Sequence, residues 1–175
     1  MINKYKLICF LVGICFSVSA QDIITSFVDK HDRDDNLKVV SIGERMMDSL
    51  SFLTSNDPDL KEAIKGVEKI RIVSSKDQDL DKEYYNSARE LLSKNKGLKE
   101  YFSTNEENKE LMVMIRESKG SVKELILLSE QPEGFNLISI SGTINLDVLL
   151  NYSEKLNIKE LDQLRSVKHK HKHNQ

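Results

Sequence analysis

Two stretches in the second half of the chain are apolar at every position, and they restrict the folds open to it. They are LMVMI at 111–115 and LILL at 125–128. Successive side chains of a β-strand point to opposite faces of the sheet, so a strand that is apolar throughout must be covered on both faces. We therefore expect two central strands, with helices covering the sheet.

The two stretches belong to a series of four short aliphatic runs. The runs are GLKEYFS, KELMVMIRES, VKELILLSE and FNLISISG, and the segments between them include Asn-Glu-Glu-Asn, Lys-Gly-Ser and Gln-Pro-Glu-Gly. Runs that are joined so closely by turn-forming residues predict an antiparallel four-strand meander.

The rest of the chain alternates between helical and strand patterns. Apolar spacing predicts helices at 22–30, 44–53, 60–65 and 80–96, strands at 37–42 and 67–73, and two helices after Gly142, the first capped by Asn145 and the second at 158–164. The fold class is therefore α+β, with a mostly antiparallel sheet packed by amphipathic helices. The sequence leaves open whether the two N-terminal strands join the sheet of the meander.

The N-terminus has the pattern of a secretory signal peptide. Lys4 and Lys6 precede an apolar stretch at 7–18, and small residues lead to Ala20, after which we expect cleavage. A membrane anchor is the alternative, but twelve apolar residues fall short of the roughly 20 that a spanning helix needs. We therefore expect export, with no transmembrane helix after cleavage.

Cleavage would leave about 155 residues, a length typical of one domain. We assign 1–20 to the signal peptide, 21–165 to a single α+β domain and 166–175 to a disordered basic His/Lys tail. The mature chain would carry 24 Lys and Arg against 28 Asp and Glu, a net charge of −4, which argues against nucleic acid as a partner. Both cysteines, Cys9 and Cys15, would leave with the signal peptide, so neither a disulfide nor a thiol nucleophile is expected.

Three segments carry a family resemblance: KELMVMIRES, SVKELILLSEQPEGFNLISISGTINLDVLL and LNIKELDQL. With the signal peptide before them, the chain resembles the exported bacterial proteins grouped as domain-of-unknown-function family 4252. The resemblance implies an α+β fold and a periplasmic or outer-membrane-associated protein of a Gram-negative bacterium. It brings no activity, cofactor or partner. We interpret Gly142 as the exit of the last strand and Asn145 as a helix cap.

Two aspartate-rich segments have the start of a calcium loop but not its remainder. Asp32, Asp34 and Asn36 occupy positions one, three and five, whereas Leu37 and Gly43 stand where glycine and glutamate are needed. The second segment, with aspartates at 77, 79 and 81, fails in the same way. Its aspartates are expected to stabilise a helix N-terminus.

The tail KHKHKHN is the remaining metal candidate. His169, His171 and His173 alternate, so in an extended chain their rings point to one side and could hold copper, nickel or zinc. The interleaved lysines repel cations, and contact with anionic lipid headgroups is the alternative.

No catalytic group is predicted. His31, the histidine inside the domain, has charged neighbours and is expected at the surface, and the glycines are scattered singly rather than grouped as in a phosphate loop. We therefore expect no cofactor and a non-catalytic binding, assembly or regulatory module, whose partner would be another envelope protein. A small hydrolase or a metal-binding envelope protein is the alternative. An interaction module should expose an apolar patch, for which the candidates are Tyr84, Tyr85, Tyr101 and Phe102.

Overall fold

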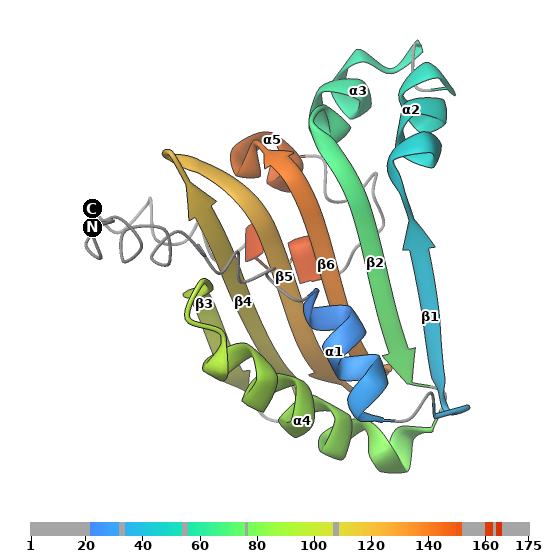
Figure 1. Cartoon of the computed structure of the whole chain (residues 1–175), viewed down its shortest axis with the longest axis vertical. Coiled ribbons are helices and arrows are strands. Elements are labelled where there is room, and N and C mark those ends of the chain that lie inside the picture. Colours follow the sequence, from blue (N-terminus) through green and yellow to red (C-terminus); the bar gives the residue numbers. More distant parts are fainter. Residues whose placement is uncertain are drawn as a thin grey trace, which may run out of the picture.

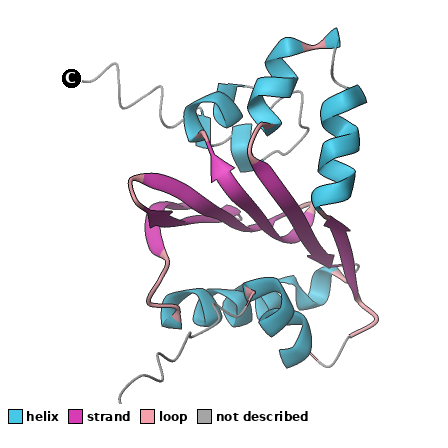
Figure 2. Ribbon diagram, turned by 45° about the horizontal axis from the view of Figure 1, so that its top comes forward, coloured by secondary structure: helices cyan, strands magenta, loops and turns pink. Residues whose placement is uncertain are grey.

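The structure of the chain is a computed structural model. It describes residues 22–31, 34–53, 56–75, 77–106, 109–151, 160–162 and 164–165. The predicted signal peptide and the predicted tail lie outside these residues. In the part that is described, one six-stranded antiparallel sheet carries helices on both faces, which confirms the α+β class (Figures 1 and 2).

The helices and strands keep the order of the predicted pattern. The helices are α1 (Ile23–Lys30), α2 (Glu44–Leu53), α3 (Pro58–Ile64), α4 (Asp81–Lys94) and α5 (Leu146–Asn151), with the short 3-10 helix η2 (Gln78–Leu80) before α4. The strands are β1 (Leu37–Ile42), β2 (Val67–Ser75), β3 (Lys99–Glu106), β4 (Lys109–Ser118), β5 (Ser121–Gln131) and β6 (Gly134–Ile144). Residues 160–162 and 164–165 are also helical.

The strands lie in the order β1-β2-β6-β5-β4-β3. Strands β3 to β6 form the predicted meander, in which each strand pairs with the next one along the chain. Strand β2 pairs with β6 and β1 pairs with β2, so the two N-terminal strands join the same sheet. This answers the question that the sequence left open.

The central strands bury side chains on both faces. In β5, Ile126 and Leu128 belong to a core beneath α1 and α4, whereas Leu125 and Leu127 belong to a second core beneath α2, α3, α5 and the helical residues at 160–162 and 164–165. All four side chains are fully buried. The strand that is apolar at every position is therefore covered on both faces, as predicted. Figure 2 shows this layered arrangement, with helices above and below the sheet. In the described part of the chain, no helix is both long enough and apolar enough to span a membrane.

Helix α1 is fixed at both its start and its middle. The Asp22 carboxylate caps it by accepting hydrogen bonds from the backbone N–H groups of Ile24, at 3.0 Å, and Thr25, at 3.3 Å. Farther along, the Phe27 ring stacks on Phe135 of β6, with 5.5 Å between the ring centroids. Phe27 is fully buried, so it anchors α1 on the sheet. The start of α1 is thereby held over β2 and β6.

The expectation for Gly142 was wrong. Gly142 lies inside β6 rather than at its exit, opposite Val67 at the start of β2, and its φ is +136°. A β carbon there would lie 2.1 Å from the backbone oxygen of Gly66. The glycine therefore permits a close approach of two backbones at a bulge.

Candidate functional site

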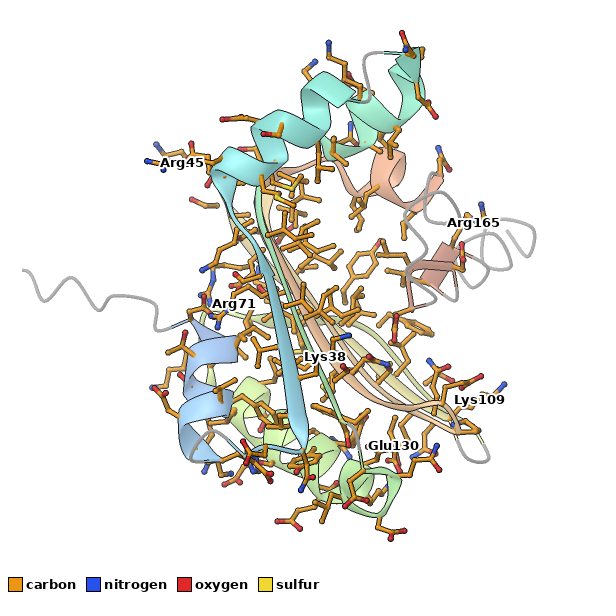
Figure 3. All side chains as sticks on the ribbon, turned by 90° about the vertical axis from the view of Figure 1, so that its right-hand side faces the viewer. Lys38, Arg45, Arg71, Lys109, Glu130 and Arg165 are labelled. Atoms are coloured by element: carbon orange, nitrogen blue, oxygen red, sulfur yellow. The ribbon has the colours of Figure 1, made fainter. Side chains whose placement is uncertain are left out.

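A polar hollow interrupts the sheet face that α1 and α4 cover. It has a volume of about 230 Å³, and we call it the charged hollow. Its lining residues are Asp22, Lys69, Arg71, Arg116, Lys123, Glu124, Ser139 and Ser141. In Figure 3 the side chain of Arg71 points to the side of the sheet on which α1 lies, near the start of that helix.

The strand register brings these residues together. Lys69 of β2 pairs with Ser141 of β6, Ser141 pairs with Glu124 of β5, and Glu124 pairs with Arg116 of β4. One row of polar residues therefore crosses four strands. Arg71 and Ser139 are a pair in the next row, toward the apolar core. The hollow thus lies where the apolar face of the sheet ends.

An ion-pair group closes one side of the hollow. The Asp22 carboxylate lies 2.8 Å from Nη1 of Arg71 and 3.2 Å from Nζ of Lys69. Arg71 Nη1 also donates to the hydroxyl of Thr25, at 2.8 Å. Partial burial by itself raises the pKa of Asp22, but the hydrogen bonds and charge of Arg71, with Lys69 adding to them, hold that pKa below its usual 3.8. Asp22 is therefore ionised at neutral pH and holds both cations in place.

A second ion pair forms the opposite side. Arg116 Nε lies 3.0 Å from Oε2 of Glu124, and the Ser139 hydroxyl donates to Oε1 of Glu124 at 3.3 Å. The guanidinium of Arg116 lies against Gly97, where a β carbon would come within 1.9 Å of Nη1. Gly97 lies in the turn after α4, and its lack of a side chain leaves room for Arg116.

His31 is not the surface residue that its charged neighbours suggested. Its ring is half-buried against Phe27, with 4.6 Å between the ring centroids, and its Nε2 lies 2.8 Å from the hydroxyl of Ser87. Burial lowers the pKa of His31 below 6.5, Lys30 adds to this effect, and Glu83 opposes it. His31 is therefore favoured in its neutral form.

The Ser87–His31 pair resembles the start of a catalytic dyad in composition only. Ser87 is 9% exposed and lies on the face of α4 that packs against α1. Asp34, a possible third member, instead accepts hydrogen bonds from the Tyr84 hydroxyl, at 2.7 Å, and from the Asn36 backbone, at 2.9 Å. A nucleophile must be able to reach a substrate, so this pair is better explained as a contact between two helices.

The structure places some of the metal candidates. Asp77 caps η2 by accepting from Asp79 N at 3.0 Å, and Asp81 is the first residue of α4, which confirms the expected helix-start role. Asp32 and the three tail histidines (His169, His171 and His173) lie outside the described residues. Within the described ranges, no three His, Cys, Asp or Glu side chains are grouped as metal ligands.

The expected aromatic patch does not form. Tyr84 and Tyr85 are 2% and 3% exposed, because α4 turns them toward the sheet and α1. Burial and the neighbouring Glu110 raise the pKa of Tyr85 to about 12. Phe102 is half-buried against the second core, and Tyr101 alone of the four is exposed. The proposed apolar surface is therefore wrong.

The sequence did not reveal the charged hollow, although it carried a trace of it. Lys69 and Arg71 share a face with the buried Val73, and Arg116 shares a face with the buried Met114. Charged residues at such inward positions indicate an uncovered part of a sheet. Their assembly into one site depends on pairing across four strands, which the sequence does not state.

The fold and the hollow define a small α+β domain with a six-stranded antiparallel sheet covered on both faces and a charged depression on one of them. A family model described as "Domain of unknown function (DUF4252)" matches residues 31–151. The chain belongs to this family, as the resemblance indicated. Neither the curated proteins nor the solved structures contain a match to the chain.

Proposed function

We propose that this protein is exported to the cell envelope of a Gram-negative bacterium, in the periplasm or at the outer membrane, and acts there as a non-catalytic binding module. The observation that supports binding is the charged hollow, which gathers donors and acceptors from four strands and a helix start at one solvent-accessible place. Such convergence of polar groups in a depression is typical of a recognition site.

The proposal of export rests on the N-terminal pattern. Two lysines, an apolar stretch and small residues before Gln21 are the features that the secretion machinery reads. The test is to express the full chain, fractionate the cells and sequence the N-terminus of the product. We expect a chain that begins at Gln21 in the envelope fractions. A cytoplasmic chain that keeps its first 20 residues would contradict the proposal.

A matched pair of variants makes this test specific. Leu11→Arg interrupts the apolar stretch and should leave an uncleaved precursor in the cytoplasm, whereas Leu11→Ile preserves its apolar character and should be processed normally. Equal processing of the two variants would show that export does not depend on this segment.

Binding at the hollow is tested by a thermal-shift screen of the purified mature chain against charged metabolites and short peptides. Ser141 lies on the floor of the hollow, so Ser141→Leu should fill it and remove the stabilisation by any ligand that binds there. Ser103→Leu is the matched control, because Ser103 is an exposed serine on β3 outside the hollow. Stabilisation that survives Ser141→Leu would place the binding site elsewhere.

The hydrolase alternative has its own test, because His31 and Ser87 are in contact. We expect Ser87→Ala to leave any background turnover of ester and peptide substrates unchanged. A measurable hydrolytic activity that Ser87→Ala abolishes would overturn the non-catalytic assignment.

A further inference from the structure

Two small residues make the floor of the charged hollow. Ser139 and Ser141 stand on β6, and the long side chains of Lys69 and Arg71 rise beside them from β2. Neighbouring strands lie roughly 4.8 Å apart, so the longer side chains on each side form walls around the serines. The depression therefore forms because the strand register places short side chains beside long ones.

The lining is positive although the chain is acidic. Four of its residues are cationic (Lys69, Arg71, Arg116 and Lys123) and two are acidic (Asp22 and Glu124), which gives a formal charge of +2. The mature chain is expected to carry a net charge of −4. Positive charge gathered in a depression with low-dielectric walls concentrates anions there.

Hydrogen-bond donors also outnumber acceptors in the hollow. The Nε–H of Arg71 is buried and meets no acceptor in the described part of the chain. The Lys123 ammonium carries three donors and makes a 2.8 Å hydrogen bond to the Thr143 hydroxyl. A buried donor without a partner is costly, and the exposed ammonium groups of Lys69 and Lys123 are donors that acceptor oxygens of a ligand can reach.

We propose that the charged hollow binds a small oxyanion, a carboxylate or phosphate group, as part of the ligand of the binding module. This inference rests on the proposed function and adds the chemistry of the ligand. Arginine and lysine donors suit carboxylate and phosphate oxygens, and the serine hydroxyls add donors at the floor. A volume of about 230 Å³ is smaller than the roughly 300–1,000 Å³ of pockets that enclose a whole ligand, so the remainder of a larger ligand would extend outside.

The experiment is a two-dimensional amide NMR titration of the mature chain, residues 21–175, at low ionic strength. Inorganic phosphate and acetate are the oxyanion probes, chloride controls for ionic strength, and choline is the cationic probe. We expect saturable shifts with phosphate, acetate or both, centred on the amides of residues 69–71, 124 and 139–141. Comparison of the Kd values for phosphate and acetate shows whether the hollow prefers a phosphate or a carboxylate group.

Two sets of variants change the hollow in opposite directions. Lys69→Gln with Lys123→Gln makes the lining neutral and should weaken oxyanion binding by about tenfold or more. Asp22→Asn raises the lining charge to +3, keeps the helix cap and should strengthen binding about threefold. A purely structural role of these residues does not predict a gain on removal of Asp22.

The matched control is Lys38→Gln with Lys61→Gln, which removes the same charge outside the hollow. Lys38 stands on β1 next to Leu37, which belongs to the core under α1 and α4, so Lys38 lies on the opposite face, and Lys61 is on α3. In Figure 3, Lys38 and Arg71 lie on opposite sides of the sheet. We expect this variant to bind the probes as the wild-type chain does. An equal loss in both double variants would mean that only net charge matters, which overturns the proposal.

Further outcomes separate this inference from the proposed function. Shifts that are the same with chloride, or that map to residues 166–175, would overturn the oxyanion site. Saturable binding of choline at the hollow without binding of either oxyanion would also overturn it, while the binding module would stand. If no ligand binds in this titration or in the thermal-shift screen, both proposals fail.

Discussion

Replacing Gly142 by alanine tests the close approach of the β2 and β6 backbones at this position. A β carbon at Gly142 would lie 2.1 Å from the Gly66 carbonyl oxygen and 2.8 Å from the Glu68 nitrogen. Both are backbone atoms, which cannot rotate away as a side chain can. The same Gly66 oxygen accepts a 2.7 Å hydrogen bond from Thr143, so any movement of the strands disturbs the pairing of β2 with β6.

The magnitude follows from two contributions. A φ of +136° is strained for any residue with a β carbon, at a cost of about 1–3 kcal/mol. Separating the strands weakens one or two backbone hydrogen bonds, at about 1 kcal/mol each. We therefore expect Gly142→Ala to lower the free energy of unfolding by about 2–5 kcal/mol, a large part of the 5–15 kcal/mol typical of a domain.

Gly134 provides the control, because alanine there would be strained by the positive φ but would not collide with another backbone. Its φ is +126°, and a β carbon there would meet its nearest atom, Oδ2 of Asp81, at 3.6 Å, which is ordinary contact. Gly134→Ala should therefore cost only the conformational strain. Urea unfolding followed by circular dichroism measures both variants, and we expect Gly142→Ala to be less stable than Gly134→Ala by about 1–2 kcal/mol. Equal stability of the two variants would refute the collision argument.

Three further predictions concern other polar contacts. Lowering the pH from above 6.5 to below it should lower the stability of the folded chain. The pKa of His31 is lower in the folded state, so the unfolded state takes up the proton first. His31→Asn should reduce this loss of stability, as measured by thermal unfolding. Asp22→Asn should lower the free energy of unfolding at neutral pH by about 1 kcal/mol, as measured by urea unfolding. The difference between the variant and the wild-type chain should disappear as the pH falls below the usual carboxyl pKa of 3.8, because Asp22 itself then becomes protonated. Ser129→Ala should cost about 1–3 kcal/mol, because Glu160 is 5% exposed and would lose the 2.8 Å hydrogen bond from the Ser129 hydroxyl; replacing Glu160 by leucine as well should recover part of the loss.

The sequence predicted the elements well where the signal was local. Strand β4 matches the predicted run at 109–118, and β1 matches 37–42, because apolar alternation and turn residues specify a strand over a few positions. The position of β2 beside β6 could not be predicted in this way. That pairing joins segments separated by the whole meander, and the register that sets it depends on which face each helix covers.

His31 shows how a local interpretation can fail when the helix face is not considered. Its immediate neighbours are charged, which suggested a solvated position. Phe27 lies four residues earlier, however, and residues at this spacing share one face of a helix. The imidazole therefore follows Phe27 into the contact with Tyr84 and Ser87 of α4. The same spacing, with Ala88 four residues after Tyr84, indicates that Tyr84 is buried rather than exposed.

The start of α1 forms part of the charged hollow. Asp22 caps this helix and holds Lys69 and Arg71, so the same carboxylate stabilises the fold and competes with any oxyanion for those donors. The competition weakens binding of a bare anion, but the ion pairs also hold the arginine in place, which lowers the entropy lost on binding. A small anion alone should therefore bind weakly. Tight binding requires a ligand that adds contacts outside the hollow, so a larger molecule bearing the same oxyanion should bind more tightly than phosphate or acetate, and its additional amide shifts would show where those contacts lie.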